Sequence, residues 1–122
     1  MTKFFRNVNL SLAALVACST LAEAFEMPEI NLPDGFHIEV LTDQVPGARS
    51  MALGDKGTLF VSTMREGKVY AVSGIDSEPE VLTIASDLYM PNGVAFKDGN
   101  LYVAEIHRVH KFENIEDRLG AP

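Results

Sequence analysis

The second half of the chain repeats a pattern found earlier in it, and this repeat restricts the possible folds more than any other feature. Residues 52–61 are matched 42 positions later by residues 94–103, with glycine on glycine, leucine on leucine and valine on valine. Residues 67–70 are matched 40 positions later by residues 107–110, so two deleted residues reconcile the offsets. A unit of about forty residues made of short strands is typical of one blade of a β-propeller.

Short apolar runs bounded by glycine and proline predict strands throughout the repeat. Residues 36–41 alternate, with Phe36, Ile38 and Val40 on one side, as in a half-buried strand. Further strands are predicted at residues 59–63, 69–72, 81–85, 93–96, 101–104 and 108–112. An Asp-Gly or Asp-x-Gly turn should join the first two strands of each unit, and one short helix is expected at residues 115–119. The expected fold class is all-β.

The length of the chain sets how much of a propeller it can supply. Its 122 residues hold about two units, whereas four to eight blades close a ring. Each blade has two apolar faces that its own strands cannot cover, so blades must stack. We therefore expect residues 36–122 to be the N-terminal blades of a longer propeller, following a linker at residues 25–35. A two-blade unit that completes a ring by oligomerising is the alternative that stays open.

Residues 1–24 have the features of a signal peptide. Lys3 and Arg6 precede an apolar stretch, and small residues lie where a signal peptidase would cut before Phe25. The apolar stretch is shorter than the roughly 20 residues that a transmembrane span needs. The mature protein is therefore expected in the periplasm or outside the cell, without a transmembrane span.

The one cysteine of the chain, Cys18, gives the leader a second interpretation. Residues 15–18 resemble a bacterial lipobox, in which residues 1–17 are removed and Cys18 is lipidated, which would anchor the domain to a bacterial membrane. Both interpretations stay open. In either case the folded part has no cysteine for a disulfide or a thiolate metal site.

The charge balance excludes one class of partner. Lys and Arg number 10 against 17 Asp and Glu, and the balance becomes 8 against 16 once Lys3, Arg6 and Glu23 leave with the signal. A surface that follows nucleic-acid phosphates needs clustered cations, which this acidic chain does not offer. We expect no nucleic-acid partner.

Seven segments, taken in order, carry a resemblance to a known family; they are residues 32–40, 48–54, 57–61, 66–72, 90–96, 101–106 and 114–119. Together they resemble the N-terminal part of the sorbosone dehydrogenase-like sugar dehydrogenases. These in turn are similar to the soluble glucose dehydrogenases that use pyrroloquinoline quinone (PQQ). The resemblance implies a six-bladed propeller that holds PQQ and a calcium ion at its axis. It also implies oxidation of an aldose or similar sugar in the periplasm, with transfer of the electrons to an acceptor.

The resemblance does not assign a catalytic residue to this chain. In the family, the base that takes the proton of the substrate hydroxyl is a histidine in a segment beyond the one where this chain stops. His37, His107 and His110 match none of the family positions, and no metal ligand is assigned. We expect this fragment to be inactive alone and to bind neither PQQ nor calcium tightly.

Three residues are candidates for contact with the cofactor. Arg49 and Asn92 precede the innermost strand of each blade and should lie near the axis. The Asn92 amide could donate to and accept from PQQ, or Asn92 could be a turn residue that tolerates left-handed backbone. Arg49 and Arg65 could clamp PQQ carboxylates, or could instead pair with Glu66 or Asp43 on the surface.

Glu105 and two histidines are weaker candidates. Glu105 ends a strand on the same face and could help bind calcium or substrate, although calcium takes roughly six to eight oxygen ligands. His107 and His110 are expected on opposite faces of a strand and its turn, as structural or solvated side chains.

Two other functions stay open. A calcium-dependent lactonase of the gluconolactonase type also has Pro-Asn-Gly before an innermost strand. It would need a metal-binding glutamate near the start of its first blade, and residues 48–50 contain none. The other is a non-catalytic binding propeller.

Overall fold

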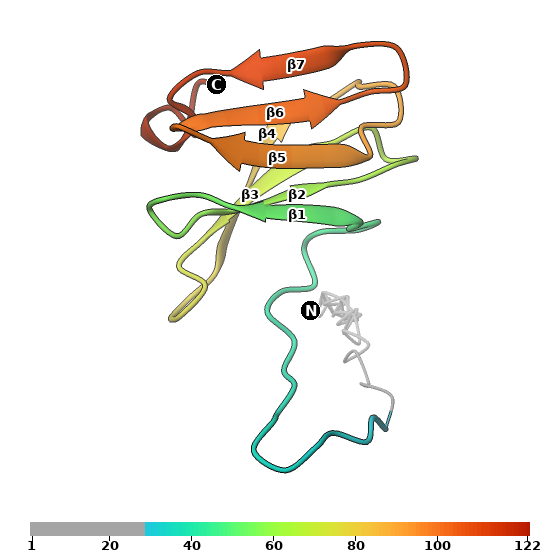
Figure 1. The fold of residues 1–122 in the computed structure, drawn as a ribbon, viewed down its shortest axis with the longest axis vertical. Helices are drawn as coiled ribbons and strands as arrows, with labels where there is room; N and C mark the ends of the chain where they lie inside the picture. The colour runs from blue at the N-terminus through green and yellow to red at the C-terminus, as the bar shows by residue number, and fades with distance from the viewer. Residues whose placement is uncertain (1–28) are drawn as a thin grey trace, which may run out of the picture.

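The computed structural model describes residues 29–122, which fold into two stacked antiparallel sheets (Figure 1). The all-β fold class is therefore confirmed. The expected signal peptide, the alternative lipobox with Cys18 and the start of the linker lie outside the described residues. Among residues 29–122 there is no helix long and apolar enough to cross a membrane.

Each sheet is a simple meander, and every neighbouring pair of strands is antiparallel. Sheet A has the order β1-β2-β3-β4, with β1 (Ser50–Leu53), β2 (Leu59–Ser62), β3 (Val69–Ser73) and β4 (Glu80–Ala85). Sheet B has the order β5-β6-β7, with β5 (Gly93–Lys97), β6 (Asn100–Ala104) and β7 (Val109–Phe112). A 3-10 helix, η1 (Ile115–Asp117), replaces the somewhat longer helix that the sequence predicts.

The strand predicted at residues 36–41 is absent, so this prediction is wrong. The segment before β1 runs away from sheet A (Figure 1), and the Phe36 side chain is 71% exposed. The alternation of Phe36, Ile38 and Val40 is that of a strand. A strand, however, needs a neighbour for its N–H and C=O groups, and no backbone pairs with this segment in the described structure.

The ladders of backbone hydrogen bonds reproduce the repeat found in the sequence. Val61 of β2 pairs with Tyr70 of β3, and Val103 of β6 pairs with His110 of β7. The counterparts are therefore 42 positions apart in β2 and β6 and 40 positions apart in β3 and β7, which confirms both offsets.

The first strand of each unit departs from the sequence alignment by one residue. Met51 pairs with Val61, and Val94 pairs with Val103, so the counterpart of Val94 is Met51 and not Ala52. Five residues lie between the paired residues Leu53 and Leu59, and four lie between their counterparts Phe96 and Leu101, so the first unit has one extra residue here. Because a shift of one residue exchanges the two faces of a strand, this correction decides which side chains of β1 and β5 are equivalent.

The turn between β5 and β6 has the residues that its backbone requires. Asp98 and Gly99 both have positive φ, 50° and 77°, between the paired residues Lys97 and Asn100. This is the two-residue Asp-Gly hairpin turn, whose twist matches that of the strands. The prediction of an Asp-Gly turn at this point is confirmed.

The main core lies between the two sheets. Phe60 of β2 stacks on Phe96 of β5, with ring centroids 5.8 Å apart and an angle of 9° between the rings. Around this pair pack the buried side chains of Val69, Ala71, Ile84, Leu101, Val103 and Ile115. Ile84 lies where the pairing of β3 with β4 is irregular, between the partners of Val69 and Tyr70. A smaller cluster of Val61, Tyr70 and Val72 lies on the other face of sheet A.

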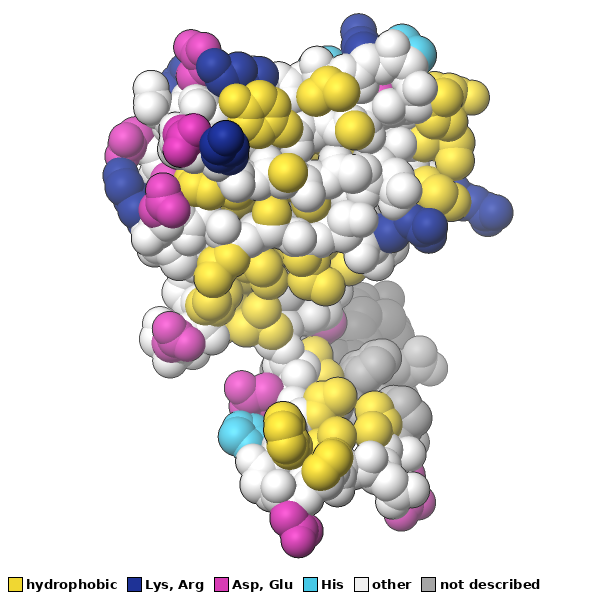
Figure 2. Space-filling model, viewed as in Figure 1, with side chains coloured by type: hydrophobic (Ala, Val, Ile, Leu, Met, Phe, Trp, Pro, Cys, Tyr) yellow, Lys and Arg dark blue, Asp and Glu magenta, His cyan; other side chains and the backbone are white. Residues whose placement is uncertain are grey.

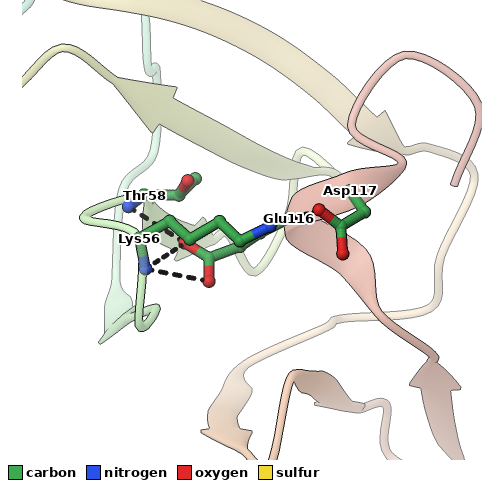
Figure 3. A network of polar contacts seen from close by, with 4 residues as sticks. All are labelled: Lys56, Thr58, Glu116 and Asp117. Carbon is green, nitrogen blue, oxygen red and sulfur yellow. Dashed lines mark hydrogen bonds and ion pairs between the residues drawn. The ribbon is translucent and has the colours of Figure 1, made fainter.

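A carboxylate fastens η1 to the turn between β1 and β2 (Figure 3). The Glu116 carboxylate accepts hydrogen bonds from the backbone N–H of Lys56, at 3.1 Å to each oxygen, and from that of Thr58, at 3.3 Å. A Cβ atom on Gly54 would lie 2.4 Å from a Glu116 oxygen, so the turn needs glycine there to admit the carboxylate. The adjacent Lys56–Asp117 ion pair is exposed on both sides, which makes its contribution small.

We predict that Glu116→Ala lowers the free energy of unfolding by about 1–2 kcal/mol, because it leaves two backbone donors of the turn without their charged acceptor. Gly54→Ala should act through the same carboxylate, since the new methyl group displaces it. Gly54→Ala should therefore cost much less in the Glu116→Ala background than in the wild type. Chemical denaturation of the four proteins measures this coupling.

Asp117→Asn is the matched control, because it removes an exposed ion pair and leaves the Glu116 carboxylate in place. Its effect should stay below about 0.5 kcal/mol. Additive costs of Gly54→Ala and Glu116→Ala would contradict the proposed clamp.

Candidate functional site

The candidate cofactor contacts Arg49 and Asn92 come together at one end of the two sheets. Arg49 immediately precedes β1 and Asn92 immediately precedes β5, and β1 and β5 lie in contact. The Arg49 Nε donates a hydrogen bond to the Asn92 Oδ1. The structure therefore joins two side chains that are 43 positions apart and equivalent in the repeat.

The backbone around this pair is fixed by sheet A. The Arg49 N–H donates to the Ser62 carbonyl at 2.9 Å, and the buried Ser62 hydroxyl donates to the Asn92 carbonyl at 2.8 Å. Ser62 thus holds the starts of β1 and β5 at once. The Arg49 and Asn92 side chains are exposed, and these hydrogen bonds hold the backbone that carries them.

The alternative role of Asn92 as a left-handed turn residue is wrong. Among the described residues, the positive φ in this loop belongs to Asp87 (58°) and Met90 (52°), and neither Asn92 nor Gly93 has one. The Asn92 N–H donates to the Met90 carbonyl at 2.8 Å. The loop therefore turns at Pro91, one residue before the Asn-Gly pair.

Arg65 lies in the turn between β2 and β3, with its side chain exposed. No hydrogen bond or ion pair within residues 29–122 joins it to Arg49 or Asn92, so this candidate is not drawn into the pair. The expected surface alternatives are also not formed, because no ion pair in the same range joins Arg49 or Arg65 to Glu66 or Asp43.

Glu105 is the most buried ionisable side chain at this end, with a fully buried carboxylate. One oxygen accepts from the Tyr89 N–H at 2.7 Å. The other accepts from the Arg108 Nε at 2.9 Å and is hydrogen bonded to the His110 Nε2. Glu105 therefore ties the loop before β5 to the turn between β6 and β7.

These contacts stabilise the ionised carboxylate. The hydrogen bond with His110 lowers the pKa of Glu105, burial opposes this, and the bonds from Tyr89 and Arg108 add to the lowering, so that the pKa falls to about 2. A carboxylate has about four acceptor positions, and three protein donors occupy most of them here. This arrangement is that of a structural anion and leaves little capacity for a calcium ion.

The sequence contains a signal for the role of Glu105 that the interpretation as a possible ligand missed. Leu101 and Val103 point into the core between the sheets, and Glu105 continues the same alternation one step past β6. His110 lies opposite Val103 in the ladder and shares its face. The alternation of β6 therefore indicates a buried carboxylate beside His110.

The remaining histidines do not contact the Glu105 carboxylate. His107 is exposed in the turn, with its ring 6.0 Å from that of Tyr89, and His37 is exposed in the segment before β1. His107 is solvated and His110 is structural, and both roles are among those that the sequence predicts for them. Within residues 29–122, no three His, Cys, Asp or Glu side chains are grouped so as to hold a metal ion.

A shallow cavity of about 310 Å³ adjoins the Arg49–Asn92 pair and is lined by Met90, Asn92, Gly93, Ala104, Glu105 and Ile106. A larger hollow of about 480 Å³ lies at the other end of the sheets, beside η1. The first is the better candidate, because it combines apolar walls with the Asn92 amide and lies next to a guanidinium.

Comparison with known proteins gives one distant relative and no family. A protein of Borreliella burgdorferi (strain ATCC 35210 / DSM 4680 / CIP 102532 / B31), described as an uncharacterized protein, is 22% identical over 107 residues. That match covers 87% of this chain and 27% of the relative, so the chain spans about a quarter of the relative's length. No family model and no solved structure matches the chain.

We predict that the wild type loses stability between about pH 4.3 and 2, and that Glu105→Gln removes most of this loss. The folded-state pKa of about 2 lies below the value of about 4.3 for an unpaired glutamate. The stabilisation is therefore complete above about pH 4.3 and is lost as the pH falls toward 2. Denaturation of both proteins across this range measures the difference.

Glu78→Gln, which changes an exposed carboxylate at the other end of sheet A, is the control and should follow the wild-type profile. Parallel pH profiles for the wild type and Glu105→Gln would show that Glu105 does not carry the effect.

Proposed function

We propose that the chain is the N-terminal part of a PQQ-dependent sugar dehydrogenase, an oxidoreductase of the periplasm built as a six-bladed β-propeller. One observation carries the proposal. Two sheets related by the repeat place their first strands side by side, and the residues before those strands, Arg49 and Asn92, meet at one end.

The relation between the sheets supports the propeller. Sheet B stacks on one face of sheet A, and β5 lies beside β1 just as each blade of a propeller sets its innermost strand next to that of its neighbour. The other face of sheet A still carries apolar side chains. The much greater length of the Borreliella burgdorferi relative is compatible with several further units in a full protein.

The donors at this end suit an anionic quinone. PQQ carries carboxylates and carbonyls, and when bound it would accept the electrons removed from the sugar. The Arg49 Nε is engaged by Asn92, which orients the guanidinium and leaves its terminal amino groups for a carboxylate. The Asn92 Nδ2 can donate to a carbonyl, and Arg65 in a neighbouring turn offers a further cation.

The described residues do not provide the rest of such a site. Glu105 is occupied by Tyr89, Arg108 and His110, so calcium ligands would have to come from further blades. The same holds for the base that takes the proton of the sugar hydroxyl. The proposal therefore assigns to this chain only the positioning of PQQ, through Arg49, Asn92 and Arg65.

We predict that the 122-residue chain alone does not oxidise sugars with an artificial electron acceptor. A protein in which further blades follow this chain should do so only after addition of PQQ and calcium. In that protein, Asn92→Ala and Arg49→Ala should each raise the PQQ concentration for half-maximal activity about tenfold, with a much smaller change in kcat at saturating PQQ.

Lys97→Ala, at the opposite end of β5, is the control and should leave the PQQ dependence unchanged. Turnover without PQQ would exclude the proposal. Hydrolysis of a sugar lactone with calcium alone would favour the lactonase instead, and absence of any turnover would favour a binding propeller.

A further inference from the structure

Sheet A has an apolar face that no part of residues 29–122 fully covers. Met51 and Leu53 point away from sheet B and are 59% and 58% exposed. Figure 2 shows hydrophobic side chains gathered just beyond β1, on the side of sheet A that faces away from sheet B. We call this surface face 1; its strand residues are Met51, Leu53, Leu59, Val61, Tyr70 and Val72.

The chain itself shows what a face of this kind contacts. Face 1 is equivalent in the repeat to the face of sheet B that packs on sheet A, namely Val94, Phe96, Leu101, Val103, His110 and Phe112. Leu53 thus stands where Phe96 stands, and Phe96 stacks on Phe60. The equivalent of face 1 is covered by a sheet within the same molecule.

The loop before β1 does not replace such a sheet. Val45 packs against Val61, Tyr70 and Val72, just as Leu88, 43 positions later, packs at the edge of the core between the sheets. The loop before each first strand therefore covers the same part of each face. On face 1, a groove of about 150 Å³ remains between residues 41–48 and sheet A, and the Met51 and Leu53 side chains remain exposed.

The outer face of sheet B supplies the complementary surface, which we call face 2. Its residues Ala95, Tyr102, Ala104 and Val109 are equivalent to Ala52, Phe60, Ser62 and Val69, which form much of the surface of sheet A that receives sheet B. Val109 is 66% exposed. Lys111 takes the place of Ala71 and pairs with Glu113, and Lys97 of β5 shares this face with Ala95, so the apolar match is confined to Ala95, Tyr102, Ala104 and Val109.

We propose that copies of this chain associate head to tail, with face 1 of one copy on face 2 of the next, in the geometry that sheet A and sheet B already share. In this arrangement Tyr102 of one copy lies against Leu53 of its neighbour, as Phe60 lies against Phe96. Each contact uses two different surfaces, so it is heterologous, and a pair of copies leaves one face of each kind free. The inference concerns the 122-residue chain by itself and does not depend on the proposed oxidation.

Two variants test the head-to-tail arrangement by sedimentation velocity. The wild type should associate increasingly as its concentration rises. Leu53→Glu damages every face 1 and Tyr102→Glu every face 2, so each variant alone should bind itself at least about tenfold more weakly. An equimolar mixture should form a dimer and nothing larger, because an intact face 2 of one variant meets an intact face 1 of the other.

This mixture separates the proposal from its rivals. A contact between two copies of face 1 would leave Tyr102→Glu self-associating, and an unfolded variant would not recover in the mixture. Phe36→Glu, which adds a charge at an exposed apolar residue outside both faces, should associate like the wild type. A monomeric wild type up to its solubility limit, association of Leu53→Glu equal to that of the wild type, or a mixture that stays monomeric would overturn the proposal.

Discussion

The stack of Phe60 on Phe96 joins sheet A to sheet B, and the position of every other feature follows from it. An antiparallel sheet of three or four short strands is barely stable alone, and burial of one apolar face against another supplies most of its stabilisation. Because the stacked rings fix one sheet on the other, β1 and β5 lie side by side and their first residues reach the same end. The Arg49–Asn92 hydrogen bond is therefore a consequence of packing in the core.

Two carboxylates secure the two ends of this packed pair. Glu105 accepts the Tyr89 N–H and so holds the loop before β5 against the turn between β6 and β7. Glu116 accepts two N–H groups of the turn between β1 and β2 and so fastens η1 to sheet A. Both replace water around backbone donors in turns, where no ladder partner exists. The loop that presents Asn92 is thus held by side-chain contacts as well as by its strand.

Local patterns in the sequence predicted most of the strands, because short apolar runs and turn residues such as Asp98-Gly99 act over a few positions. They did not reveal the extra residue between β1 and β2, since aligning Ala52 with Val94 looks as good as aligning Met51 with it. Backbone pairing decides that question, and it reverses the faces of β1. The prediction of a strand at residues 36–41 was wrong because an alternating pattern is typical of a strand but does not provide a second strand for it to pair with. Glu105 was misjudged because its partner His110 comes from the adjacent strand.

The corrected register links the two proposals for this molecule, namely the cofactor site at Arg49 and Asn92 and the association through the apolar faces 1 and 2. Pairing in the ladder fixes both which side chains of β1 face outward and which residue precedes the strand. A sheet that docks on face 1 as sheet A docks on sheet B would place its own first strand beside β1. Its preceding loop would then lie near Arg49, as the loop with Asn92 does now. Any ligand too large for Arg49 and Asn92 alone would gain further groups from such a sheet, so covering the apolar face and completing the polar site would be one event.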